Sequence, residues 1–133
     1  MSSSVPPPRT ATSWRVLLVE DESMVAMLLE DILAELGYEI VGPVAWVDKA
    51  VAMARGDALD AAILDVNLNG QEVYPVAEAL AARGIPFVFA TGYGHGGLRP
   101  PYGDRPTLPK PFRLRDVQAV LARLRHEAEA GRR

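Results

Sequence analysis

The sequence of 133 residues lacks the features that mark several large classes of protein. It contains no cysteine, which excludes a disulfide framework and any thiolate chemistry. No apolar run approaches the roughly 18 residues that a membrane-spanning helix needs, and residues 1–13 lack the apolar segment of a signal peptide. Basic residues are not in excess, because the formal net charge is -3, so nucleic acid is not expected as a partner. We therefore expect a cytoplasmic protein that binds neither a membrane nor nucleic acid.

The composition is that of one folded domain. Hydrophobic residues make up 49% of the chain and charged residues 23%, which is typical of a globular protein with an ordinary core. Residues 1–13 are rich in Ser, Thr and Pro, a composition that predicts a disordered tail. We expect the domain to span residues 14–127 and residues 128–133 to form a C-terminal tail.

Short apolar segments alternate with longer segments of helical periodicity along the chain. The apolar segments are bounded by turn-forming residues and predict buried parallel strands at 16–19, 38–41, 61–64, 87–90 and 107–108. The periodic segments predict helices at 23–36, 48–55, 72–83 and 114–127. This alternation predicts an α/β fold in which a doubly wound, five-stranded parallel sheet is connected by right-handed crossovers.

Local residue types predict the ends and the buried faces of these helices. Ser23 is a predicted N-cap, Gly37 should follow the end of its helix, and Pro75 lies in a first turn, where a missing N–H is tolerated. Trp14 and Trp46 are expected to be packing residues. The arginines of the last helix are interpreted as a solvated face. The residues expected to face inward are Val25, Leu28, Leu29, Ile32 and Leu36 in the first helix, and Leu114, Val117, Leu121 and Leu124 in the last.

One helix of the alternating pattern is missing between Thr91 and Lys110. Residues 92–103 contain five glycines and two prolines and show no amphipathic pattern. Helix formation is disfavoured by roughly 1 kcal/mol for each glycine and by about 3 kcal/mol for an interior proline. We therefore predict that a fourth helix is short or replaced by a glycine-rich loop. His95 lies in this loop without a companion ligand and is not expected to bind a metal.

Polar residues follow the predicted strands at the point where each strand ends. Glu20-Asp21 follow the first strand, Asp65 follows the central one, Thr91 comes next, and Lys110 follows the last. Because the carboxyl ends of parallel strands meet at one edge of the sheet, these side chains should converge there. Asp65 follows four apolar residues, where an unpaired charge is costly. Three carboxylates, one hydroxyl and one ammonium group are thus predicted to share a site.

This ordered set resembles the constellation of the CheY-like response-regulator receiver domain, a family with a flavodoxin-like sheet. The resemblance covers residues 14–127. The segment 86–94, which reads Pro-Phe-Val-Phe-Ala-Thr-Gly-Tyr-Gly, resembles in particular the FAT GUY receivers, which are often stand-alone proteins. That group tends to lack the switch aromatic three positions before the lysine, and Thr107 occupies this position here. A poorly formed fourth helix is also a property of that group.

The resemblance implies a role for each residue of the predicted site. Asp65 would be the phosphoacceptor, and Mg²⁺ would be bound by Asp21, Glu20, Asp65 and the main-chain carbonyl of Asn67. A hard divalent cation with oxygen ligands relieves the repulsion between a carboxylate and a phosphoryl group.

The resemblance also implies how the phosphoryl group would be held and sensed. Lys110 would neutralise one phosphoryl oxygen, and Pro111 would follow it as a supporting residue. Thr91 would move inward and donate its hydroxyl to another oxygen, and Gly92 would leave the site open to a phosphodonor. Because Thr107 is too small to act as the usual aromatic switch, the loop 92–103 is expected to become ordered on activation, with Tyr93 or Tyr102 as the aromatic contact.

The implied function is a single-domain response regulator of a two-component system or phosphorelay. A histidine kinase or a histidine phosphotransfer protein would supply the phosphoryl group, and the signal would leave by protein contact or onward phosphotransfer to a partner that the sequence does not identify. Such a protein is not an enzyme beyond self-phosphorylation from small donors and autodephosphorylation. Two alternatives stay open. A haloacid-dehalogenase-like phosphatase would carry a second aspartate where Asn67 stands, and a phosphorylation-independent interaction module would not use Asp65.

Overall fold

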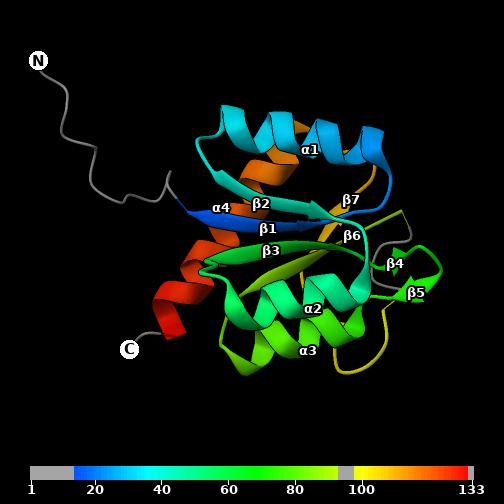
Figure 1. Ribbon diagram of the computed structural model, residues 1–133. Helices are drawn as coiled ribbons and strands as arrows, with labels where there is room; N and C mark the ends of the chain where they lie inside the picture. The colour runs from blue at the N-terminus through cyan, green and yellow to red at the C-terminus, as the bar shows by residue number, and fades with distance from the viewer. Residues whose placement is uncertain (1–13, 93–97, 132–133) are drawn as a thin grey trace, which may run out of the picture.

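The computed structural model describes residues 14–92 and 98–131. Five parallel strands form one sheet in the order β2-β1-β3-β6-β7, with helices on both faces (Figure 1). The predicted α/β fold with a doubly wound parallel sheet is confirmed. The strands of the sheet are β1 (Arg15–Val19), β2 (Glu39–Val44), β3 (Ala61–Asp65), β6 (Phe87–Thr91) and β7 (Thr107–Pro109). The helices are α1 (Ser23–Glu35), α2 (Val47–Gly56), α3 (Tyr74–Ala82) and α4 (Leu114–Gly131).

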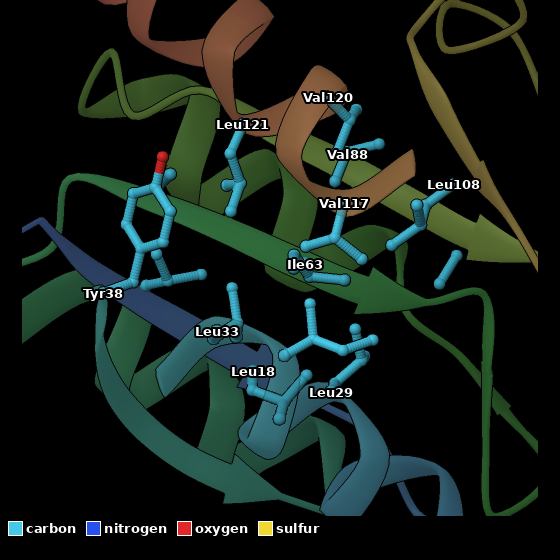
Figure 2. Close-up of a cluster of buried hydrophobic side chains, with 14 of the residues drawn as sticks. Leu18, Leu29, Leu33, Tyr38, Ile63, Val88, Leu108, Val117, Val120 and Leu121 are labelled. Atoms are coloured by element: carbon cyan, nitrogen blue, oxygen red, sulfur yellow. The ribbon is translucent and has the colours of Figure 1, made fainter. Parts of the chain in front are cut away.

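The core lies in two layers, because successive side chains of a strand point to opposite faces of the sheet. On one face, side chains of β1, β3 and β6 pack between α1 and α4, and Figure 2 shows Ile63 between Leu33 of α1 and Val117 of α4. On the other face, the alternate strand residues pack against α2 and α3. All five residues of β3 are buried, which makes it the central strand and places Asp65 at its buried end.

The helix ends agree with the predicted signals at two of three positions. Gly37 follows α1 with φ +89°, a left-handed conformation that suits glycine, and Pro75 lies in the first turn of α3. The prediction for Ser23 was wrong, since Ser23 is the first residue of α1 and Glu22 is the N-cap, without a side-chain capping bond. The N–H of Glu22 is bound instead by the carboxylate of Glu20, which holds the turn between β1 and α1.

A hairpin that the sequence analysis did not predict follows β3. Its strands are β4 (Asn67–Leu68) and β5 (Gln71–Glu72), joined by Asn69-Gly70, and it delays the start of α3 to Tyr74. Both turn residues have positive φ, 51° and 82°. Asn-Gly is the dipeptide most favoured in two-residue hairpin turns of this kind. The hairpin lies beyond the carboxyl edge of the sheet, beside the ends of β3 and β6 (Figure 1).

Several apolar residues lie elsewhere than predicted. Leu28 is 43% exposed. The buried face of α1 includes Ala26 and Leu33, and Leu28 lies outside it. Leu114 and Trp46 are also exposed, so the expectation that they pack inward was wrong. Trp46 directly precedes α2, outside the helix's buried side, and Leu114 lies at the very start of α4.

The last helix ends later than predicted, at Gly131 instead of Glu127. Val117, Leu121 and Leu124 are buried as predicted. Trp14 packs against the core, and the guanidinium of Arg125 lies over its ring.

Residues 98–106, which we call the strap, occupy the place of the missing helix. They form turns, and among the described residues between β6 and β7 there is no helix. Several contacts hold the strap on the domain, among them a hydrogen bond from the guanidinium of Arg105 to the main-chain oxygen of Phe87. The ring of Tyr102 contacts those of Tyr74, Phe87 and Phe89, and the main-chain N–H of Arg99 donates to the hydroxyl of Tyr74 at 3.0 Å. Tyr93 and His95 lie outside the described residues.

Candidate functional site

The predicted polar residues meet at the carboxyl edge of the sheet. Asp65 ends β3 and Thr91 ends β6, while Glu20 and Lys110 come directly after β1 and β7. These four strands are neighbours in the sheet, so parallel pairing brings their ends together. Carboxylate oxygens of Glu20, Asp21 and Asp65 lie within 4.8 Å of one another. The Nζ atom of Lys110 lies 3.5 Å from Oε1 of Glu20 and 3.5 Å from Oδ1 of Asp65.

Glu20 is the most deeply buried of the three acids, with 3% of the residue exposed. Its Oε2 atom accepts the N–H of Glu22 at 3.1 Å. Its Oε1 atom is buried and has no hydrogen-bond partner within the part of the chain that the structure describes. Burial raises the pKa of Glu20 to about 7, and the negative charge of Asp65 adds to this effect, whereas Lys110 opposes it. In the metal-free protein, burial therefore favours the neutral form of Glu20 more than that of an exposed glutamate.

Asp65 is also buried, with 9% of the residue exposed. Burial raises the pKa of its carboxyl group, and the charge of Asp21 acts in the same direction. The ammonium group of Lys110 is the largest effect that lowers this pKa. Two buried acids thus share one lysine, and the cluster carries more negative charge than Lys110 can balance.

Asp21 lies at the more accessible side of the cluster. Its Oδ2 atom accepts the main-chain N–H of Asn69 at 2.9 Å, so the turn of the β4–β5 hairpin contacts the carboxylate. Asn67 begins this hairpin, and its side-chain Oδ1 accepts the N–H of Gly70 at 3.0 Å. Its main-chain carbonyl is the fourth ligand expected for a cation.

The remaining predicted residues line the same edge. Thr91 is 6% exposed, and its main-chain carbonyl accepts the N–H of Lys110 at 3.4 Å. The peptide bond between Lys110 and Pro111 is cis. Gly92 is exposed, and apart from its chain neighbours no atom of residues 14–92 and 98–131 would lie within 4 Å of a Cβ atom at that position. Thr107 is half-buried and lies beside Phe89 in the sheet.

The arrangement fits a hard divalent cation. Such cations take oxygen ligands, and carboxylates gathered from separate strands provide them. The buried Oε1 atom of Glu20, which lacks a hydrogen bond, would gain a partner from a bound ion. The same ion would balance the excess negative charge of the cluster.

Comparison with protein families decides the class. Residues 16–122 match the family model described as the response regulator receiver domain. The chain belongs to this family. Receiver domains bind Mg²⁺ at an acidic site and act as phosphoacceptors in two-component signalling, where they interact with histidine kinases. The findings fit a response regulator and favour neither the phosphatase nor the phosphorylation-independent module.

Individual relatives agree with this assignment. The transcriptional regulatory protein PdtaR of Mycobacterium tuberculosis is 34% identical over 111 residues, which cover 80% of this chain and 54% of that protein. The solution structure of SdrG from Sphingomonas melonis Fr1 is 49% identical, with a TM-score of 0.76, and the match covers 85% of this chain and 97% of SdrG. The receiver domain of the sensor histidine kinase PA1611 from Pseudomonas aeruginosa, whose structure has a magnesium ion in the active-site cleft, is 25% identical, with a TM-score of 0.71, and the match covers 84% of this chain and 97% of that domain.

The chain spans about half the length of the curated relatives that it matches, PdtaR among them. None of the helices in residues 14–92 and 98–131 is both long enough and apolar enough to cross a membrane. Sequence reasoning brought together every acid of the cluster but missed Asn69, whose N–H reaches Asp21. The Asn-Gly dipeptide was the available signal for it.

Proposed function

We propose that Asp65 accepts a phosphoryl group from a phosphohistidine of a histidine kinase or a histidine phosphotransfer protein. A carboxylate oxygen of Asp65 would form the new O–P bond as the N–P bond breaks, and the electron pair of that bond would stay on the imidazole nitrogen. The observation that carries this proposal is the position of Asp65, which lies at a buried strand end between two further acids and 3.5 Å from Nζ of Lys110. Lys110 would balance the charge of one phosphoryl oxygen as a point charge.

Glu20, Asp21, Asp65 and the main-chain carbonyl of Asn67 would hold Mg²⁺. When bound, the ion supplies charge neutralisation for the attacking carboxylate and the phosphoryl oxygens. The buried Oε1 atom of Glu20, which has no hydrogen-bond partner among the described residues, supports this ligand set, as does the pKa of Glu20, which burial raises to about 7.

Thr91 would donate its hydroxyl to a phosphoryl oxygen, and Gly92, which has no side chain, would leave the site accessible to the phosphodonor. Thr107 would leave the usual aromatic switch position without an aromatic ring, as in the FAT GUY receivers. The signal would therefore leave through another element, by protein contact or by onward phosphotransfer. We place the protein in the cytoplasm, where histidine kinases obtain their phosphoryl groups from ATP.

The phosphoacceptor is tested with a small donor. Acetyl phosphate and Mg²⁺ should add one phosphoryl group to the wild-type protein, detected by intact mass spectrometry, and Asp65→Asn should remove the labelling. Asp31→Asn, an exposed aspartate on α1, is the matched control and should be labelled like the wild type. Labelling of Asp65→Asn at the wild-type level would contradict the proposal. A phosphotransfer profile against the purified histidine kinases of the source organism would then identify the donor.

A further inference from the structure

The tip of the β4–β5 hairpin contacts two other loops at the site edge through a single residue. The main-chain N–H of Asn69 donates to Oδ2 of Asp21 at 2.9 Å. Its side-chain Nδ2 donates to the main-chain oxygen of Ala45, between β2 and α2, at 2.8 Å. Asn69 therefore joins three segments that are 24 and 48 residues apart along the chain.

The conformation of Asn69 makes this N–H available. In the hairpin, Leu68 pairs with Gln71, so Asn69 and Gly70 form a two-residue turn with φ values of 51° and 82°. Asparagine tolerates a left-handed backbone better than most residues that have a side chain. The N–H of Gly70 is used inside the turn by the side chain of Asn67, whereas the N–H of Asn69 points to Asp21.

From these contacts we propose that Asn69 is a positioning residue for the Mg²⁺ site. The inference rests on the proposed function, in which Asp21 and the carbonyl of Asn67 both bind the ion. Asp21 lies in the loop after β1 and Asn67 lies in β4, and Asn69 links these two segments. The N–H binds Oδ2 of Asp21, so that Oδ1 would be the oxygen that this carboxylate offers to a cation. The amide bond to Ala45 keeps the turn from moving away from the sheet.

A half-exposed aspartate without this contact would lose side-chain freedom only when the ion binds, and that ordering weakens binding. A carboxylate that a hydrogen bond already holds in place has little side-chain freedom left to lose when the ion binds. Hydrogen-bond partners of metal ligands commonly change metal affinity by roughly 10- to 100-fold when removed.

The test is a titration with Mn²⁺, a hard cation that suits the same oxygen ligands, followed by electron paramagnetic resonance of the free ion. Asn69→Ala loses the amide bond and places alanine in a left-handed conformation, and it should raise the Mn²⁺ dissociation constant roughly tenfold. Asn69→Gly, like Asn69→Ala, keeps the main-chain N–H and loses the amide bond to Ala45, but it suits the left-handed backbone, and we expect a roughly threefold increase.

Gly84→Ala is the matched control. It places alanine at another left-handed position, with φ +70°, at the turn between α3 and β6, where no described residue other than the chain neighbours lies within 4 Å of the new Cβ. Urea unfolding in chelator should show that Gly84→Ala and Asn69→Ala lose comparable stability, while Gly84→Ala should bind Mn²⁺ like the wild type.

Three results would overturn the inference. Wild-type affinity in both Asn69 variants would show that neither the amide bond to Ala45 nor the strain on the turn affects the position of a ligand. Equal weakening by Gly84→Ala would show a general effect of strain. A wild-type protein that does not bind Mn²⁺ would overturn the proposed site together with the inference, so the two failures are distinguishable.

Discussion

Tyr102 stacks on Tyr74 with ring centroids 5.5 Å apart and ring planes 7° from parallel. The same ring meets Phe87 and Phe89 edge-on, at centroid distances of 6.0 and 5.6 Å. In this way one side chain of the strap covers the part of β6 that a helix would otherwise cover. A glycine- and proline-rich segment that cannot form a helix is thus still held on the domain, by aromatic packing instead of a helical face.

Replacing Tyr102 with alanine should destabilise the domain by about 2 kcal/mol, below the usual cost of a buried aromatic because this ring is half-buried. Tyr102→Phe keeps the stacked ring and should stay within about 0.5 kcal/mol of the wild type. Urea unfolding in chelator measures both variants. If Tyr102→Ala proved as stable as Tyr102→Phe, the strap would not be held by this ring.

The stability of the metal-free protein should fall as the pH rises from 4.5 to 7. The pKa of Glu20 is 4.5 in the unfolded reference and about 7 in the folded protein. The folded state therefore holds the proton more strongly, and the stabilisation is complete below pH 4.5 and lost as the pH passes 7. Glu20 alone accounts for at most about 3 kcal/mol. Asp65, whose pKa is also raised by burial, acts in the same direction.

The variant Glu20→Gln isolates this contribution, because glutamine cannot ionise. Its stability relative to the wild type, measured by urea unfolding in chelator, should rise across this pH range and level off above it. A constant difference between pH 4.5 and 8 would show that the buried carboxylate is not destabilising when charged.

Mg²⁺ should stabilise the wild-type protein, because the ion binds the folded state and relieves repulsion between the acids. At a hundred times the dissociation constant the gain is about 2.7 kcal/mol. Asp21→Asn should have two opposite effects: it should stabilise the metal-free protein and weaken the response to Mg²⁺. Thermal unfolding at several Mg²⁺ concentrations measures both, with Asp31→Asn as the control. A melting curve that Mg²⁺ leaves unchanged would argue against the metal site.

The position of the main site could be predicted because its polar residues come at the carboxyl ends of the strands. Asp65 and Glu20 each come after an uninterrupted apolar run, and parallel pairing then requires them to meet. Thr91 and Lys110 follow by the same rule. The geometry within the cluster could not be predicted, because the burial of Glu20 and the lack of a hydrogen bond at its Oε1 atom depend on tertiary packing that the local sequence does not specify.

The start of α1, its buried face and the contacts of the strap could not be predicted from local sequence signals alone. Ser23 is a good N-cap residue, but the carboxylate of Glu20 binds the N–H of Glu22 and fixes the turn one residue earlier. On α1, Leu29 and Ile32 are buried as predicted, but small Ala26 is buried while Leu28 is exposed, so hydrophobicity alone misplaced one residue of this helix. The strap was predicted to be a loop, but its anchors could not be seen in the sequence, since Tyr74 lies 25 residues before Arg99.

The strap should be protected from hydrogen exchange before activation at the amides that the structure shows bonded, although its composition predicts rapid exchange throughout. The N–H of Arg99 donates to the hydroxyl of Tyr74, and those of Tyr102 and Arg105 donate to carbonyls within the strap at 2.7 and 3.1 Å.

Tyr74→Phe removes one acceptor but keeps the ring on which Tyr102 stacks. Because one hydrogen bond is worth about 1 kcal/mol, exchange at Arg99 should accelerate roughly fivefold or more, while Tyr102 and Arg105 change little. Tyr38→Phe, which removes a hydroxyl bonded to α4, is the control. Exchange detected by NMR in the metal-free protein measures all of these amides. Unprotected exchange at Arg99, Tyr102 and Arg105 in the wild type would show that the strap is not anchored before activation. In that case, the whole strap could become ordered when beryllofluoride activates the protein.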